Sequence, residues 1–156
     1  MLRYEKSVWI NAPVERVWAF HERDDIFDLL NPPGENIQIL SRKGKLHTGS
    51  RVEFKIPVAG PIHIRWLALH VAHEVNHHFV DEQIRGPFRY WKHEHIFEPE
   101  TGGARLTDRV TFSLPLSPFN DWLFGGLAKM RLNKLFEHRH TVTKQYCERP
   151  FPVPAE

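Results

Sequence analysis

The feature that most constrains the fold is the contrast between the middle of the chain and its last long segment. Residues 35–114 contain no convincing long helix, but they carry β-rich stretches separated by turn clusters such as Gly86-Pro87. These stretches are residues 35–42, 50–58, 62–75, 78–86, 90–98 and 104–115. Because the connections are short, we expect neighbouring strands to pair as antiparallel hairpins.

The segment from about Phe119 to Tyr146 shows helical periodicity instead. Its apolar residues fall on one broad arc at 100° per residue: Leu123, Phe124, Leu127, Ala128, Leu132, Leu135, Val142 and Tyr146. This predicts one helix of roughly seven turns, about 40 Å long. Gly125 and Gly126 weaken its beginning, which marks either a mobile entrance or close packing against a strand. One helix against an antiparallel sheet is an α+β architecture.

The chain begins with a further strand and two short helices. Residues 3–11 alternate like a strand, and Lys6 on the otherwise apolar face favours a position at the sheet edge. Asn11 is expected to cap a helix that has Pro13 in its first turn. A second short helix over residues 24–30 ends before a Pro-Pro-Gly turn. The predicted sheet therefore has seven strands.

Length and composition indicate one globular domain. The 156 residues are 41% hydrophobic and 26% charged, and we place the domain at residues 1–148, with a Pro-rich C-terminal tail at residues 149–156. The single cysteine, Cys147, excludes an internal disulfide, and no signal-like segment begins the chain, so we expect a cytoplasmic protein. No apolar run is long enough to span a membrane. The net charge of +2 does not indicate a nucleic-acid partner, and a homodimer through exposed sheet or the tail is one alternative.

Several motifs resemble one known superfamily. The first strand is followed by Ala12-Pro13-x-x-x-Val17-Trp18, which resembles the start of the START-type helix-grip superfamily, also called SRPBCC. The similarity continues through Gly86-Pro87-Phe88, Trp91-x-His93-x-His95-x-Phe97 and residues 103–110, and closes with Leu135-Phe136-x-x-Arg139-His140. It covers nearly the whole chain and is to the branch of bacterial proteins described as polyketide cyclase/dehydrase-like or ligand-binding. The resemblance implies a curved sheet wrapped around a long C-terminal helix with a ligand cavity between them, and it does not name a reaction.

The most informative strand is residues 90–97. Alternation puts His93 and His95 on one face together with aromatic residues, and we assign this less charged face to the side beneath the long helix. Pairing across the turn that follows would set His95 opposite Asp108. This pair is either a general acid–base pair or a buried hydrogen-bonded pair that fixes the hairpin register.

Further residues are candidates for contact with a ligand. Asp81 and Gln83 alternate on the preceding strand, and whether they face inward or toward solvent depends on the register near Gly86. Arg131 lies within the apolar arc of the long helix, where it either meets an anionic group of a ligand or snorkels at the cavity rim. The predicted ligand-binding residues are Trp66, Asp81, Gln83, Trp91, His93, Phe97, Phe112, Leu127 and Arg131, and the catalytic candidates are His95 and Asp108.

The sequence does not predict a metal site. His70 and His73 are three residues apart in strand-like sequence, which places them on opposite faces. His93 and His95 have good strand spacing for two ligands, but they need a third ligand from elsewhere, and no familiar metal motif accompanies them. The basic residues of the long helix, His140 among them, spread around it and indicate a solvated surface.

Three functional hypotheses follow from these observations. The leading one is binding of a small hydrophobic molecule, such as a polyketide, lipid or aromatic ring compound, in a cavity between the sheet and the long helix. The second is a cyclase or dehydratase that uses a cavity histidine as general acid or base. Neither requires a cofactor. The third is an interaction or structural protein without a small ligand.

Overall fold

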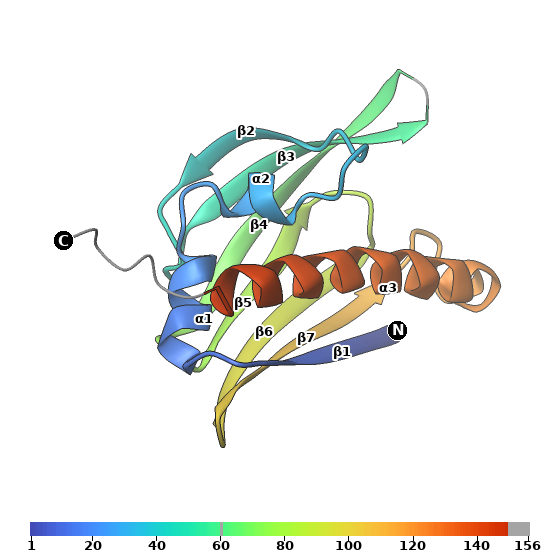
Figure 1. Cartoon of the computed structure of the whole chain (residues 1–156). Coiled ribbons are helices and arrows are strands. Elements are labelled where there is room, and N and C mark those ends of the chain that lie inside the picture. The colour runs from blue at the N-terminus through green and yellow to red at the C-terminus, as the bar shows by residue number, and fades with distance from the viewer. Residues whose placement is uncertain (60, 150–156) are drawn as a thin grey trace.

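A single curved antiparallel sheet and one long helix form the body of the protein in the computed structural model, which describes residues 1–59 and 61–149. The sheet runs in the order β1-β7-β6-β5-β4-β3-β2. Its strands are β1 (Leu2–Ile10), β2 (Gln38–Lys43), β3 (Arg51–Ala59), β4 (Ile62–Glu74), β5 (His78–Arg85), β6 (Tyr90–Glu100) and β7 (Gly103–Ser113). The long helix α3 (Phe119–Cys147) crosses the concave face of the sheet (Figure 1). The predicted helix-grip α+β fold is confirmed.

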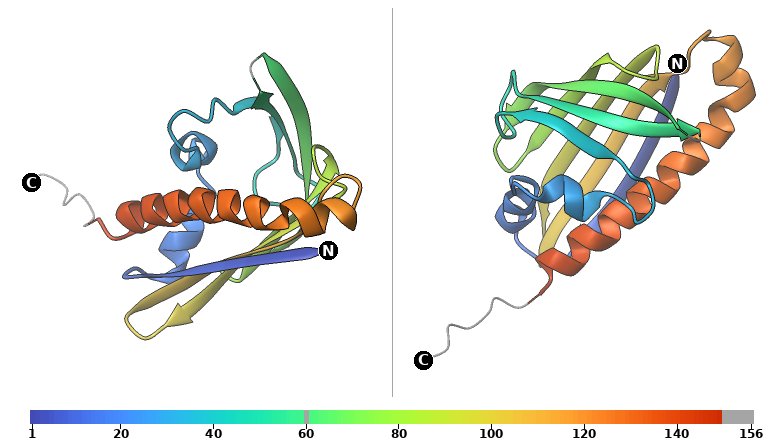
Figure 2. Two further views of the ribbon diagram at one scale, coloured as in Figure 1. Left: turned by 90° about the vertical axis from the view of Figure 1, so that its right-hand side faces the viewer. Right: turned by 90° about the horizontal axis from the view of Figure 1, so that it is seen from above.

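One end of the curved sheet lies against α3, and the other end curves away from it. Figure 2 shows β1 and β7 running close beneath the helix, while β2 and β3 swing away from it on the other side. The short helices α1 (Val14–His21) and α2 (Ile26–Leu30) lie at one end of the molecule, near the C-terminal end of α3. In the described part of the chain, no helix is long and apolar enough to cross a membrane. Apart from Arg149, the predicted Pro-rich tail lies outside the described residues.

The hairpin of β6 and β7 has the predicted register. Phe97 pairs with Leu106, and His95 pairs with Asp108. β1 pairs with β7 and forms one edge of the sheet, as Lys6 indicated, and the Lys6 ammonium group donates a hydrogen bond to Oδ1 of Asn133 in α3 at 3.0 Å. Alternation alone therefore predicts which side chains of β6 and β7 face the helix.

The starts of the two short helices differ from the prediction. Pro13 is the N-cap of α1 and no side chain caps this helix. The expectation that Asn11 is the cap is therefore wrong; its backbone N–H donates to the carboxylate of Glu148 in the C-terminal part of the chain, at 2.8 Å. α2 begins at Ile26, two residues later than predicted, and the carboxylate of Asp25 pairs with Arg23 at 2.7 Å.

The limits of α3 agree with the prediction, but its buried face differs from the predicted arc. The first half exposes Leu123, Phe124 and Leu127, whose exposed fractions are 50%, 47% and 56%. Gly125 is buried there, and an added Cβ would lie 3.0 Å from the methyl groups of Leu2. Among the alternatives for this glycine, close packing against a strand is the one observed. The buried residues of α3 are Asp121, Gly125, Leu132, Phe136, His140, Thr143 and Cys147.

Candidate functional site

A layer of buried histidine and aspartate side chains separates two apolar clusters in the core. The first cluster includes Trp18 and Phe97, and the second includes Trp91 and Phe136. Along β6, the side chains that face α3 pass from the first cluster through two histidines into the second, because every other residue of a strand points the same way. We call this group the polar layer: Asp81 of β5, His93 and His95 of β6, Asp108 of β7 and His140 of α3.

Asp108 lies at the centre of the polar layer. Its Oδ1 is 2.8 Å from Nε2 of His93, and its Oδ2 is 2.6 Å from Nε2 of His140, so the carboxylate accepts hydrogen bonds from two rings on two different elements. Nδ1 of His95 is also 2.8 Å from Oδ1, but outside hydrogen-bond geometry. Asp108 thereby ties the sheet to α3, and its own side chain is only 5% exposed.

Asp81 approaches the same two rings of β6 from the other side. It pairs with His93 in the sheet register, and its Oδ2 is 3.4 Å from Nδ1 of His93 and 4.0 Å from Nε2 of His95. Within the described residues, this oxygen is buried and accepts no hydrogen bond. The rings of His93 and His95 are 3.8 Å apart, centroid to centroid. Each ring therefore has one nitrogen near Asp108 and the other near Asp81.

The close packing of charges shifts the ionisation of the polar layer. Burial opposes the charge of His93, but the carboxylates of Asp108 and Asp81 outweigh burial and raise the pKa of His93 to about 9. Burial and the neighbouring positive charge of His93 lower the pKa of His95 to about 4. Burial also opposes both carboxylate charges, yet the histidines lower the pKa of Asp81 to about 2 and hold that of Asp108 well below its usual range.

Aromatic rings and further histidines surround the polar layer. Phe79 of β5 stacks on His95 at a centroid distance of 3.9 Å, and Phe136 meets His93 edge-on at 5.0 Å. The ring of His21, the last residue of α1, lies 6.3 Å from that of His95. Its Nδ1 hydrogen-bonds with the backbone carbonyl of Val17 in the same helix. Burial lowers the pKa of His21. The layer thus combines polar groups with a mostly aromatic wall.

The structure brings four of the predicted site residues together and places the others elsewhere. His93, His95, Asp108 and Asp81 belong to the polar layer, which settles the inward direction of Asp81. The amide of Gln83 instead donates to the carbonyl oxygen of Phe88 at 2.7 Å and holds the β5–β6 connection.

The predicted aromatic residues are core residues. Phe97 and Phe112 are almost fully buried, and Trp91 packs edge-on against the half-buried Trp66 at 5.0 Å. They flank the polar layer in the two apolar clusters.

Leu127 and Arg131 lie on the exposed surface of α3, and the structure does not bring them to the polar layer. On a helix, both residues point away from the buried stripe formed by Leu132 and Phe136.

His140 is the member of the polar layer that the analysis of the sequence missed. Its assignment to a solvated basic surface is wrong, since the side chain is 4% exposed and hydrogen-bonded to Asp108. A signal was present, because Leu132, Phe136 and His140 are spaced by four residues and form one stripe of the helix. The stripe continues through Thr143 and Cys147, both buried.

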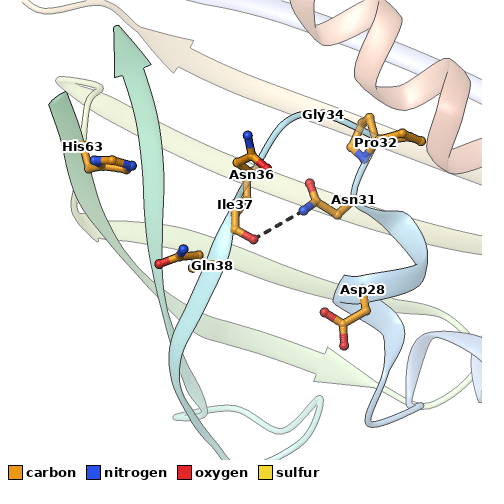
Figure 3. Close-up of a pocket in the computed structure, with 9 residues that line it drawn as sticks. Asp28, Asn31, Pro32, Gly34, Asn36, Ile37, Gln38 and His63 are labelled. Atoms are coloured by element: carbon orange, nitrogen blue, oxygen red, sulfur yellow. Dashed lines mark hydrogen bonds between the residues drawn. The ribbon is translucent and has the colours of Figure 1, made fainter. Parts of the chain in front are cut away.

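A pocket with a volume of about 610 Å³ lies away from the polar layer, at the rim formed by α2, the segment that follows it and β4. Figure 3 shows Asn31, whose side-chain amide donates to the carbonyl oxygen of Ile37 at 3.4 Å across this segment. The pocket contains none of the predicted site residues. Its lining residues are Asp28, Asn31, Pro32, Pro33, Gly34, Asn36, Ile37, Gln38 and His63.

Comparison with known proteins places the chain in a family. The family model described as polyketide cyclase / dehydrase and lipid transport matches residues 10–138, so the chain belongs to this family. A comparison with curated proteins finds no significant match.

Solved structures share the fold at low sequence identity. The Zhui aromatase/cyclase from Streptomyces sp. R1128 is 16% identical with a TM-score of 0.72, over 95% of this chain and 94% of that one. TTHA0849 from Thermus thermophilus is 20% identical with a TM-score of 0.67, over 93% of this chain and 99% of that one. A nucleoside-diphosphate sugar epimerase from Corynebacterium glutamicum is 25% identical with a TM-score of 0.70, over 93% of this chain but only 28% of that one.

Proposed function

We infer that the protein binds a small apolar molecule that carries a hydroxyl group or a similar hydrogen-bond donor, and that the polar layer holds this group. The proposal rests on one observation: the edge of the polar layer formed by Asp81 and His95 is partly exposed, and we call it the half-open edge. The side chains of Asp81 and His95 are 20% and 13% exposed, whereas those of His93, Asp108 and His140 are at most 5% exposed. A ligand group can therefore reach only this edge.

The chemistry of the edge favours a donor on the ligand. A carboxylate only accepts hydrogen bonds, and Oδ2 of Asp81 accepts none among the described residues. A buried acceptor without a donor costs free energy, so a ligand hydroxyl that reaches it gains more than it would at an exposed carboxylate. The ring of Phe79 stacks on His95 at this edge, so the surface beside the ligand hydroxyl group is aromatic.

One contact favours a second candidate function, acid–base catalysis of the cyclase or dehydratase type. Nδ1 of His95 lies 2.8 Å from Oδ1 of Asp108, and the side chain of His95 is 13% exposed. After a small rotation of the ring, this carboxylate would accept a hydrogen bond from Nδ1 and orient an imidazole whose other nitrogen moves a proton of the substrate. The family description names both cyclase/dehydrase and lipid transport, and thus supports either candidate.

A pair of matched probes tests the binding proposal. We expect 2-naphthol to bind about 10-fold more tightly than 2-methylnaphthalene, which has a methyl group in place of the hydroxyl, because one buried hydrogen bond contributes about 1 to 1.5 kcal/mol. Titration calorimetry in the presence of EDTA measures both affinities. The variants Asp81→Val and His95→Phe should remove the preference for 2-naphthol. Glu82→Gln changes the next residue of β5, on the opposite face, and should retain it.

Equal affinities for the two probes, or binding of neither, would contradict the proposal. Native mass spectrometry of freshly purified protein, followed by extraction, identifies any molecule that copurifies. If that molecule is converted by the wild-type protein but only retained by His95→Gln, the second candidate is supported. Conversion at an unchanged rate by His95→Gln would exclude His95 as the acid or base.

A further inference from the structure

Two imidazoles and one carboxylate converge at the half-open edge of the polar layer. Nδ1 of His93, Nε2 of His95 and Oδ2 of Asp81 all lie within 4.8 Å of one another. Oδ2 of Asp81 is 3.4 Å from the His93 nitrogen and 4.0 Å from the His95 nitrogen. Two ligand atoms bound tetrahedrally to one Zn²⁺ ion at about 2.1 Å are about 3.4 Å apart, so only small side-chain movements separate these atoms from a coordinating arrangement.

The fold supplies the ligand that the sequence motif lacks. The spacing His93-x-His95 points both rings to one face of β6, and a third ligand has to come from another element. Asp81 is the partner of His93 in the register between β5 and β6, so its side chain lies on the same face. Three residues from two paired strands in the interior of the sheet thereby form the set.

The far nitrogens of both rings face a second carboxylate. Oδ1 of Asp108 is 2.8 Å from Nε2 of His93 and 2.8 Å from Nδ1 of His95. A histidine that ligates a metal usually donates its other N–H to a carboxylate or carbonyl, which fixes the ring and strengthens its metal-binding nitrogen. Asp108 already fills this role toward His93 and is close enough to Nδ1 of His95 to fill it there after a small ring rotation, and His140 holds its other oxygen at 2.6 Å.

We propose that Asp81, His93 and His95 bind a divalent transition-metal ion such as Zn²⁺ or Fe²⁺, with Asp108 as the carboxylate that orients both histidines. The ion binds ring nitrogens in their deprotonated form, so its binding releases any proton held there. Two imidazoles and one carboxylate suit Zn²⁺ and Fe²⁺, whereas Mg²⁺ and Ca²⁺ prefer sets made of oxygen ligands. The partial exposure of Asp81 and His95 leaves further coordination positions open to water or to another ligand.

Titration of the metal alone tests the site without any organic ligand. Protein treated with EDTA and then dialysed is titrated with Zn²⁺ by calorimetry. We expect one ion bound per chain and no comparable binding of Mg²⁺. Asp81→Asn and His95→Gln should each lower Zn²⁺ affinity by roughly 100-fold or more, and Asp108→Asn by about 10- to 100-fold, as is typical for residues behind the metal ligands. Circular dichroism verifies that each variant is folded.

Two matched control variants test whether Zn²⁺ binds elsewhere on the surface. Glu82→Gln removes the neighbouring carboxylate on the opposite face of β5, and His78→Gln removes the histidine that pairs with Glu74 at 3.6 Å. Both should leave Zn²⁺ affinity within about 2-fold of wild type. Co²⁺ in place of Zn²⁺ gives a visible ligand-field spectrum that should be lost in Asp81→Asn and retained in Glu82→Gln.

The proposal is overturned if Zn²⁺ does not bind, if Asp81→Asn binds as tightly as wild type, or if His78→Gln abolishes binding. Loss of folding in Asp81→Asn would leave His95→Gln to decide. Because these measurements contain no organic ligand and the naphthol titrations contain EDTA, the metal proposal and the proposed function can fail independently of each other.

Discussion

The first apolar cluster and the polar layer are both buried, but they gain their stability in different ways. Phe97 packs edge-on against Trp18 at 5.1 Å, and both rings gain free energy simply by leaving water. Asp108 and His93 lose hydration on burial and recover it only through mutual contacts such as the 2.8 Å hydrogen bond. When such groups are replaced by apolar residues of similar size, the protein is often as stable as before or more stable. Burial of apolar area therefore accounts for the cluster but not for the layer, whose groups are stable only as a connected set.

The largest expected effect concerns the apolar cluster. Phe97→Ala should lower the free energy of unfolding by about 3 to 5 kcal/mol, because it removes a fully buried ring and leaves a cavity. Urea unfolding followed by circular dichroism measures the change. As a control, Phe119→Ala removes a ring that is 62% exposed and should change stability by less than about 0.5 kcal/mol. A loss below about 1 kcal/mol for Phe97→Ala would show that this part of the core is loosely packed.

The next prediction concerns the access of solvent and reagents to the first cluster. Cys147 belongs to the first cluster, and burial raises the pKa of its thiol to about 11. At pH 8 the thiolate fraction is then about 100-fold lower than for the ordinary thiol, so a disulfide reagent should react at least about 100-fold more slowly with native than with urea-unfolded protein. The rate of release of the reagent's chromophore measures this. Fast reaction of the native protein would mean that this end of the core opens readily.

The coupling energy expected within the polar layer is smaller than the effect of Phe97→Ala. Asp108→Asn, His140→Gln and the double variant form a cycle across the 2.6 Å contact between β7 and α3. We expect a coupling energy of about 1 to 3 kcal/mol, because each single variant leaves the other buried group without its partner. Phe97→Ala and Phe112→Ala lie in different apolar contexts and should add within about 0.5 kcal/mol. Additive effects of Asp108 and His140 would show that the layer is not a connected network.

The contrast between the two regions also explains what the sequence could predict. Alternation and a short turn are local properties, so the register that brings His95 opposite Asp108 follows from residues close together in the chain. The direction of Asp81 does not, because it depends on which residue of β6 lies opposite it across the connection that contains Gly86, and this pairing begins only at Glu82 and Lys92. A change of one residue in this register reverses the face of every residue of the strand, and the sequence does not mark it.

The role of His140 is missed for a different reason. The predicted arc joins the most apolar residues of the segment, and several of these, such as Leu123 and Leu127, are exposed in the first half of α3. The buried stripe of the second half contains His140 because the facing residue of the sheet is Asp108. Periodicity of apolar residues identifies a helix correctly, but it does not identify the buried face where that face is polar.

The smallest prediction concerns the two glycines at the point where α3 leaves the core. A Cβ on Gly126 would meet nothing within 4 Å, so Gly126→Ala should raise the free energy of unfolding by about 0.5 to 1 kcal/mol through the better helix propensity of alanine. At Gly125 the added Cβ would lie 3.0 Å from the methyl groups of Leu2, and these must shift. Gly125→Ala should therefore gain less than Gly126→Ala or lose stability. Urea unfolding measures both, and adding Leu2→Ala to Gly125→Ala should recover part of the difference. Equal gains for the two alanine variants would show that β1 yields to α3 at this point, and that the close packing at Gly125 does not hold the first half of the helix in place.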